Sequence, residues 1–216
     1  MSSPLTSSTP WPRLKRNLVA ILRGIKPDEV EPIVGGLIEA GFEAIEIPLN
    51  SPDPFRSIET AARLAPDGVL IGAGTVVETG DVMRLADVGG RLLVSPNVDT
   101  EILAEAGRRS LVTMPGVFTP TEAFTALKAG ASALKFFPAS VLGSKGIGAV
   151  MAVLPKGTIV GAVGGVSESD FGDYASVGVT AFGLGSSLYK PGLSPEEVKR
   201  RAEAAVTGWD AAYPSE

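Results

Sequence analysis

The chain has 216 residues, of which 44% are hydrophobic and 20% charged, and its formal net charge is −5. This composition is that of an ordinary globular protein, and the net negative charge gives no indication of a nucleic-acid or anionic-membrane partner. Cysteine and histidine are both absent, which excludes disulfides, thiolate nucleophiles, serine–histidine triads and zinc sites built from these residues. Acid–base chemistry near neutral pH therefore depends on carboxylates, lysine, tyrosine or water.

The first 16 residues are rich in serine and proline and include several basic residues. They lack the apolar core of about 7–15 residues that a secretory signal requires. A transit peptide would also be serine-rich, but this segment is short. No apolar run in the chain approaches the roughly 20 residues of a membrane span. We expect residues 1–16 to be a flexible tail and residues 17–216 to form one domain.

From residue 17 onward, short apolar runs alternate with helical stretches. The runs are nearly continuous in valine, isoleucine, leucine and alanine, which is typical of parallel strands covered on both faces. Eight such runs are present, at residues 18–25, 42–50, 69–76, 91–97, 110–117, 131–139, 157–166 and 179–188.

Three of the intervening stretches show clear helix boundaries. Residues 27–41 begin with proline and two acidic residues and end at Gly41, as helices with a favourable dipole arrangement do. Residues 119–130 begin with "TPTE", which is close to a capping box, and end at Gly130. Residues 193–208 contain Ser194, a proline and two glutamates at their start. The repeating order of strand and helix predicts a single (β/α)8 TIM barrel of the α/β class, with an open doubly wound sheet as the alternative.

In such a barrel the active site lies at the C-terminal ends of the strands, and one of these ends contains an unusual lysine. Lys135 lies within "ALKFFPAS", between apolar residues. It could extend its amine to solvent or pair with a carboxylate. Burial would instead lower the pKa of its ammonium group. A neutral amine attacks ketones and forms a Schiff base, so we interpret Lys135 as a nucleophile.

Two other charged residues interrupt apolar strands. Glu46 lies between isoleucines in "EAIEIPLN", and in the absence of histidine it is the best general acid or base, whether or not it also pairs with a cation. Arg23 in "AILRGI" is either a structural ion-pair partner or a clamp for an anionic substrate, because a guanidinium matches a carboxylate. Thr75 follows Gly72 and Gly74, and these glycines allow the backbone to approach a ligand closely, although Thr75 would also be ordinary in a strand.

Two glycine-rich turns end the last two runs. They are "VGGVSESD" and "GLGSSL", and backbone N–H groups in such turns can bind a phosphate. A pair of turns after strands 7 and 8 is the common phosphate site of barrels. Neither turn has the spacing of a dinucleotide fingerprint.

Taken in order, the motifs "AILRGI", "FEAIEIPLNSP", "IGAGTV", "SPN", "MPGVFTPTEA", "ALKFFPAS", "AVGGV" and "GLGSSLY" extend from Ala20 to Tyr189. With them the sequence resembles the bacterial Schiff-base (class I) aldolases that cleave 2-dehydro-3-deoxy-6-phospho-sugar acids. The resemblance implies that Lys135 forms the imine, that Glu46 transfers protons and that Thr75 contacts the substrate carboxylate beside Arg23. It also implies that the phosphate binds at Gly164, Gly165, Gly185 and Ser186.

Two subfamilies act on the phosphogluconate and phosphogalactonate keto acids, and the residues resemble the second more closely. Gluconate-type members have arginine where this chain has Asn50, whereas the galactonate type has arginine on the first strand, as Arg23 is here. Val163 stands where gluconate-type members have threonine, and it is expected to face C4 of the substrate, where the two epimers differ. Pro96 and Phe137, also at strand ends, are expected to line the pocket.

The resemblance thus predicts reversible cleavage of 2-dehydro-3-deoxy-6-phosphogalactonate to pyruvate and D-glyceraldehyde 3-phosphate. It further implies a cytoplasmic homotrimer that needs neither metal nor cofactor. A non-catalytic sugar-phosphate sensor and a sugar-phosphate epimerase on the same scaffold are the alternatives. An epimerase requires an acid and a base on opposite faces of one carbon, or a metal, and the missing histidines argue against it.

Overall fold

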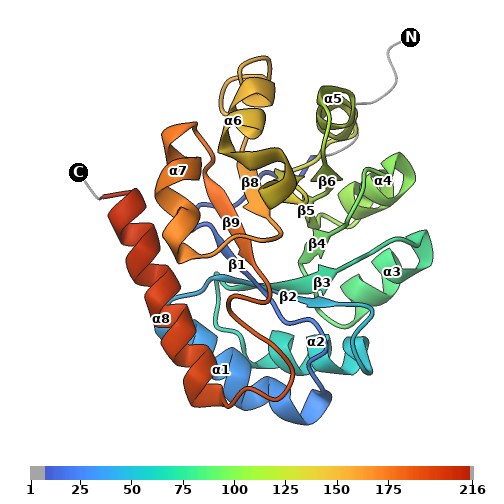
Figure 1. Cartoon of the computed structure of the whole chain (residues 1–216). Coiled ribbons are helices and arrows are strands. Elements are labelled where there is room, and N and C mark those ends of the chain that lie inside the picture. The colour runs from blue at the N-terminus through green and yellow to red at the C-terminus, as the bar shows by residue number, and fades with distance from the viewer. Residues whose placement is uncertain (1–7, 215–216) are drawn as a thin grey trace.

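The computed structural model describes residues 8–214 and shows strands surrounded by helices (Figure 1). Within this range nine parallel strands form one sheet in the order β5-β4-β3-β2-β1-β9-β8-β7-β6. The strands are β1 (Leu18–Ile21), β2 (Ala44–Pro48), β3 (Leu70–Gly74), β4 (Leu92–Val94), β5 (Val112–Met114), β6 (Gly116–Val117), β7 (Leu134–Phe136), β8 (Val160–Val163) and β9 (Ala181–Leu184).

The two ends of this strand order meet, because only Pro115 separates β5 from β6 in the chain. The N–H of Ala133 donates to the carbonyl of Thr113 (3.0 Å), and the N–H of Lys135 donates to the carbonyl of Pro115 (2.9 Å). The first bond joins β5 to the β7 run, and β6 pairs with β7 directly. Proline has no N–H to donate to a ladder, so one barrel strand is divided in two. The predicted (β/α)8 barrel is confirmed, and the open sheet is excluded.

The helices form the outer layer. They are η1 (Pro27–Glu29), α1 (Val30–Ala40), α2 (Pro54–Leu64), α3 (Thr79–Asp87), α4 (Thr100–Arg108), α5 (Pro120–Lys128), α6 (Ala139–Met151), η2 (Glu168–Asp170), α7 (Phe171–Ser176) and α8 (Pro195–Ala212). The three helical stretches predicted from the sequence correspond to η1 with α1, to α5 and to α8, and the end of the last one differs. Thr119 and Glu122 form the predicted capping box of α5. The last helix continues past Gly208 to Ala212, and a β-carbon on Gly208 would lie 2.9 Å from Cβ of Glu168. This glycine therefore permits close packing. None of the helices in residues 8–214 combines the length and hydropathy of a membrane span.

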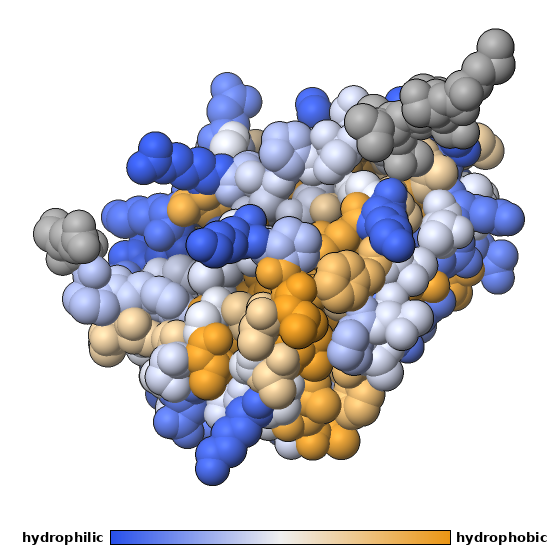
Figure 2. Space-filling model, turned by 90° about the horizontal axis from the view of Figure 1, so that it is seen from above, coloured by the Kyte–Doolittle hydropathy of each residue, from blue (hydrophilic) through white to orange (hydrophobic). Residues whose placement is uncertain are grey.

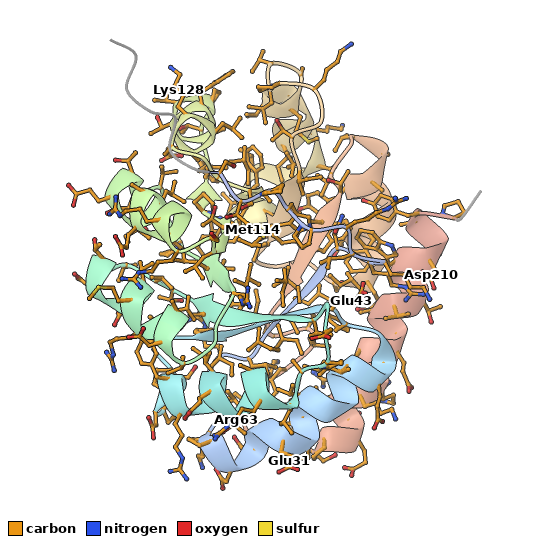
Figure 3. All side chains as sticks on the ribbon, turned by 180° about the vertical axis from the view of Figure 1, so that it is seen from behind. Glu31, Glu43, Arg63, Met114, Lys128 and Asp210 are labelled. Atoms are coloured by element: carbon orange, nitrogen blue, oxygen red, sulfur yellow. The ribbon has the colours of Figure 1, made fainter. Side chains whose placement is uncertain are left out.

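A small apolar cluster fills the interior of the barrel, separate from the larger core between strands and helices. Met114 belongs to it and lies near the centre of the molecule in the view from behind (Figure 3). Trp11 and Leu14 pack against the same cluster from outside.

Other contacts hold the segment before β1 in place. Trp11 Nε1 donates to Asn17 Oδ1 (2.9 Å), and the N–H of Lys15 donates to Glu43 Oε2 (2.6 Å). Arg16 pairs with Asp210 of α8 at 2.7 Å. Of the segment expected to be a flexible tail, residues 1–7 lie outside the described part of the chain. Residues 8–16 pack against the barrel at the N-terminal ends of the strands.

Candidate active site

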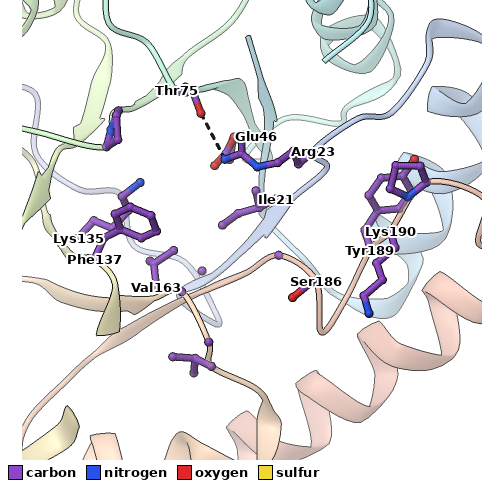
Figure 4. A pocket seen from close by; sticks show the side chains of 17 residues that line it. Ile21, Arg23, Glu46, Thr75, Lys135, Phe137, Val163, Ser186, Tyr189 and Lys190 are labelled. Atoms are coloured by element: carbon purple, nitrogen blue, oxygen red, sulfur yellow. Dashed lines mark hydrogen bonds between the residues drawn. The ribbon is translucent and has the colours of Figure 1, made fainter. Parts of the chain in front are cut away.

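A pocket of about 340 Å³ opens at the C-terminal ends of the strands (Figure 4). Residues from both halves of the chain line it, as the convergence of parallel strands in a barrel requires. The predicted site residues that line the pocket are Arg23, Glu46, Thr75, Pro96, Lys135, Phe137, Val163, Gly164, Gly165, Gly185 and Ser186. Asn50 is the one predicted residue that does not line it, and it reaches the site through a hydrogen bond to Arg23.

Lys135 is the central residue of β7, and only 7% of it is exposed. Its Nζ lies 4.9 Å from the centre of the Phe137 ring, so one side of the amine faces an aromatic surface. Burial lowers the pKa of Lys135 to about 8, the Arg23 charge acts in the same direction, and Glu46 opposes both. Much more of the amine is thus neutral near physiological pH than in an exposed lysine.

Glu46 lies on β2 and is 3% exposed. Its Oε2 atom is buried and has no hydrogen-bond partner among the described residues. Burial raises the pKa of Glu46 to about 7, against the lowering effect of Lys135 and Arg23. The carboxyl group can therefore gain or lose a proton at neutral pH, as a general acid or base must.

Arg23, Asn50 and Thr75 form a polar group at the ends of β1, β2 and β3. Arg23 Nη1 donates to Asn50 Oδ1 (2.6 Å). Its Nη2 donates to Thr75 Oγ1 (3.4 Å), the bond drawn in Figure 4. Thr75 has φ +56°, a conformation that is rare for a β-branched residue. Such strain is commonly found at functional sites. Together these contacts hold the guanidinium at the mouth of the pocket.

The opposite end of the pocket is formed by the two glycine-rich turns. Gly164 and Gly165 have φ +93° and +71°, which glycine adopts without strain. A β-carbon on Gly165 would also lie 2.4 Å from Oγ of Ser140. After β9, the N–H groups of Leu188 and Tyr189 both donate to the carbonyl of Gly185, which makes this second turn helical. Both turns bring main chain to the pocket wall.

Several lining residues were not predicted. Ile21 precedes Arg23 by two positions, and the alternation of a strand places such residues on the same face, so this signal was available. Tyr189 and Lys190 lie beyond the last glycine turn, in a stretch that has the composition of a surface loop. Tyr189 is 3% exposed, and its hydroxyl is 3.5 Å from Glu29 Oε2, to which it donates. Burial and this carboxylate raise the pKa of Tyr189 to about 12. The other unpredicted lining residues are Val166, Gly183 and Pro191.

A buried amine and a buried carboxylate at the C-terminal ends of barrel strands are the groups that lysine-dependent carbon–carbon lyases use. The family model described as "Aldolase: KDPG and KHG aldolase" matches residues 13–204. The chain therefore belongs to the KDPG and KHG aldolase family, and the resemblance found in the sequence is confirmed.

Individual relatives agree with this family. The chain is 64% identical over 204 residues to a Rhizobium meliloti protein named "Probable 2-dehydro-3-deoxy-6-phosphogalactonate aldolase", covering 94% of this chain and 96% of that one. It is 46% identical to the Escherichia coli K12 protein named "2-dehydro-3-deoxy-6-phosphogalactonate aldolase", with 90% and 95% covered. The solved structure named "Native KDPGal structure" superposes with a TM-score of 0.91 at 45% identity, and 94% and 98% of the two chains are covered.

Proposed function

We propose that this protein catalyses the reversible cleavage of 2-dehydro-3-deoxy-6-phosphogalactonate to pyruvate and D-glyceraldehyde 3-phosphate. The observation that carries the proposal is that Lys135 and Glu46, both almost fully buried, line the same pocket. The names and high identity of the two relatives support the choice of substrate.

The reaction begins at the Lys135 amine. Its lone pair attacks the C2 ketone, and the resulting carbinolamine loses water to give an iminium. Burial favours this step, because it increases the fraction of neutral amine. The iminium then accepts the electron pair of the bond that breaks.

Glu46 moves the protons in the next steps. Its carboxylate takes the proton from the C4 hydroxyl, directly or through a water, while the C3–C4 bond breaks. The bond electrons form an enamine on C3, and the aldehyde leaves as glyceraldehyde 3-phosphate. Protonated Glu46 then returns a proton to C3, and hydrolysis of the iminium releases pyruvate and the free amine. The raised pKa of Glu46 suits both directions of transfer.

The two ends of the pocket suit the two anionic ends of the substrate. Arg23 and Thr75 hold the carboxylate next to the reacting ketone. The turns at Gly164–Gly165 and Gly185–Ser186 bind the phosphate through N–H groups and the Ser186 hydroxyl. Binding energy at the distant phosphate then orients the reacting carbons.

The preference between C4 epimers depends on Val163. A β-carbon on Gly183 would lie 2.7 Å from Cγ2 of Val163 and 3.3 Å from Cδ1 of Ile21. Gly183 thus gives space to two apolar side chains, and the wall near Val163 offers no hydroxyl to a substrate. Asn50 at the carboxylate end also favours the galactonate epimer, because the cation at this end is Arg23 and not an arginine at position 50. The phosphogluconate epimer as main substrate is the alternative that an assay of both epimers would reveal.

The homotrimer and the cytoplasmic location implied by the resemblance stay predictions. Hydrophobic residues gather in the middle of the face seen from above (Figure 2), and an apolar area of this kind suits contact between copies. Val141 and Val153, near the two ends of α6, are also exposed apolar side chains, at 72% and 59%. Light scattering coupled to size-exclusion chromatography measures the number of chains.

Borohydride trapping tests the chemistry. Pyruvate with borohydride should add one reduced pyruvate to the protein, as measured by intact mass, and digestion should place it on Lys135. The Lys135→Met variant should show neither adduct nor turnover. An adduct that persists in this variant would show that another amine forms the imine, and its absence from the wild type would contradict the Schiff-base mechanism. Absence of both the adduct and pyruvate release in the wild type would favour a sugar-phosphate-binding protein without turnover.

A further inference from the structure

Lys190 lines the pocket at its phosphate end but has no function in the mechanism above. It lies just beyond the helical turn of residues 186–188, in which the N–H groups of Leu188 and Tyr189 donate to the carbonyl of Gly185. Ser186 and Lys190 both line the pocket, and Figure 4 shows both on the side of it away from Lys135. The flexible four-carbon stem of Lys190 allows its amine to turn toward a group bound at this end.

The main chain around Lys190 is held in place by its two neighbours. Tyr189 is buried, and Pro191 packs over Gly24 so closely that a β-carbon on Gly24 would lie 2.8 Å from its Cγ. Gly24 adjoins Arg23, so this contact joins the loop after β9 to the loop after β1. The loop is thereby folded back over the pocket, while the Lys190 side chain itself is exposed.

The Lys190 amine is not used elsewhere. Within residues 8–214 no carboxylate lies within ion-pair distance of it, although most exposed arginines on the helices have such partners. The other two cations that line the pocket already have functions in the mechanism: Arg23, which is bonded to Asn50 and Thr75, binds the carboxylate, and Lys135 forms the imine. Lys190 is thus the cation left for the phosphate end.

The phosphate end needs a cation because its other donors are neutral. A phosphate monoester has a charge of about −1.5 to −2 near pH 7, whereas the glycine turns and Ser186 supply only backbone N–H groups and a hydroxyl. We propose that Lys190 binds the substrate phosphate from the open side of the pocket, opposite the glycine turns. This inference rests on the proposed function and adds a charged residue to its phosphate site.

The test compares Lys190→Met with Lys190→Arg and with Lys156→Met. Lys156 is an exposed lysine in the loop before β8, at the opposite end of the barrel, and its loss changes the net charge equally. For the phosphorylated substrate, Lys190→Met should raise KM by about tenfold and change kcat less than threefold. Lys190→Arg should restore most of the binding, and Lys156→Met should have the wild-type KM.

The dependence on ionic strength distinguishes a charge contact from a merely structural one. The kcat/KM of the wild type should fall as salt rises, and this slope should flatten in Lys190→Met. The non-phosphorylated keto acid should be cleaved equally by both proteins. An unchanged KM and an unchanged salt slope in Lys190→Met would overturn the proposal.

Binding at equilibrium separates this proposal from the proposed function. Calorimetric titration with glycerol 3-phosphate requires no turnover, and Lys190→Met should bind it about tenfold more weakly than the wild type does. The pyruvate adduct should form equally in both proteins, since it does not involve the phosphate end. Equal binding of glycerol 3-phosphate would overturn the proposal even if the adduct forms, and a missing adduct would overturn the mechanism even if Lys190 binds phosphate.

Discussion

The Glu46 carboxylate occupies the space where a side chain on Gly74 would begin, since a β-carbon on Gly74 would lie 1.7 Å from Oε2 of Glu46. The Gly74→Ala substitution should therefore displace the carboxylate and lower kcat by about 10²-fold or more. Removal of the acid–base group itself, as in Glu46→Gln, should lower kcat by about 10²–10⁴-fold. Gly80→Ala, in α3 where nothing lies within 4 Å, is the matched control and should keep wild-type kinetics. Circular dichroism verifies that each variant is folded. Activity within threefold of the wild type in Gly74→Ala would contradict this assignment of the space.

The rate of imine formation should depend on pH through Lys135. Its pKa is lowered to about 8, and only the neutral amine attacks a ketone. The initial rate of borohydride-trappable adduct formation from pyruvate should therefore rise with pH and level off above about 8. A rise that is still continuing near pH 10, as for an ordinary lysine, would show that burial does not activate this amine.

Glu46 should make the stability of the protein depend on pH in the opposite sense to a typical surface carboxylate. Its pKa is raised from 4.5 to about 7, so the folded protein holds a proton that the unfolded chain has released between these values. The stabilisation that this proton gives the folded state is fully present below pH 4.5. The free energy of unfolding then falls as the pH rises through about 7, by an amount on the order of 3 kcal/mol. Lys135, with a pKa lowered from 10.5 to about 8, is protonated in both states over most of this range.

Urea unfolding at several pH values measures this effect. Between about pH 5 and pH 7.5, the free energy of unfolding should decline more steeply in the wild type than in Glu46→Gln, which lacks the titrating group. Parallel curves for the two proteins would mean that Glu46 titrates alike in the folded and unfolded states.

Asn50 should act on substrate binding through Arg23. Because its Oδ1 accepts from Arg23 Nη1 at 2.6 Å, Asn50→Ala should leave the guanidinium less well oriented and raise KM for the keto acid severalfold. Asn50→Asp keeps an acceptor but pairs its charge with the arginine, so it should weaken carboxylate binding more than alanine does. Asn97→Ala is the control, since within residues 8–214 the Asn97 side chain donates only to the carbonyl of Val98. Wild-type KM in both Asn50 variants would exclude this function.

Val163→Thr tests the preference for the C4 epimer. An apolar wall discriminates between substrates by only about 10–200-fold, whereas a site built to bond a hydroxyl discriminates far more strongly. The wild type should therefore prefer the galactonate epimer while turning over some of the gluconate epimer, and threonine should narrow or reverse this ratio. Pyruvate release from both purified epimers gives the ratio, and a wild-type preference for gluconate would refute the subfamily assignment but not the aldolase assignment.

Much of the fold was predictable because barrel strands are covered on both faces and stand out as apolar runs. All eight runs contain strands of the barrel. The division of the fifth run into β5 and β6 was not predicted. Pro115 lacks an N–H group, but the sequence does not show whether a hydrogen bond to the neighbouring strand is needed at that position. The end of α8 was misjudged because a glycine can end a helix or allow another segment to approach it, and Gly208 does the second.

The site was predictable where chemistry and position coincide. Arg23, Glu46 and Lys135 are charged residues inside apolar runs of the sequence, Glu46 and Lys135 lie on strands and Arg23 just after one, and the barrel brings these strand ends to one pocket. Lys190 has no such signal, because its place at the pocket depends on Pro191 packing over Gly24, a contact between residues far apart in the chain. The positive φ of Thr75 could not be predicted either, because threonine is common in strands and gives no sign of an unusual backbone conformation.

The ion pair between Arg16 and Asp210 joins the two ends of the barrel domain on the side opposite the pocket. Trp11 and Leu14 lie at that closed end, and Tyr213 is bonded there to the carbonyl of Val179, just before β9. A carrier domain or solid support attached through either end of the chain would thus be connected at the base of the barrel. The protein would be held with its pocket facing outward, so that immobilisation through either end would leave the path of the substrate open.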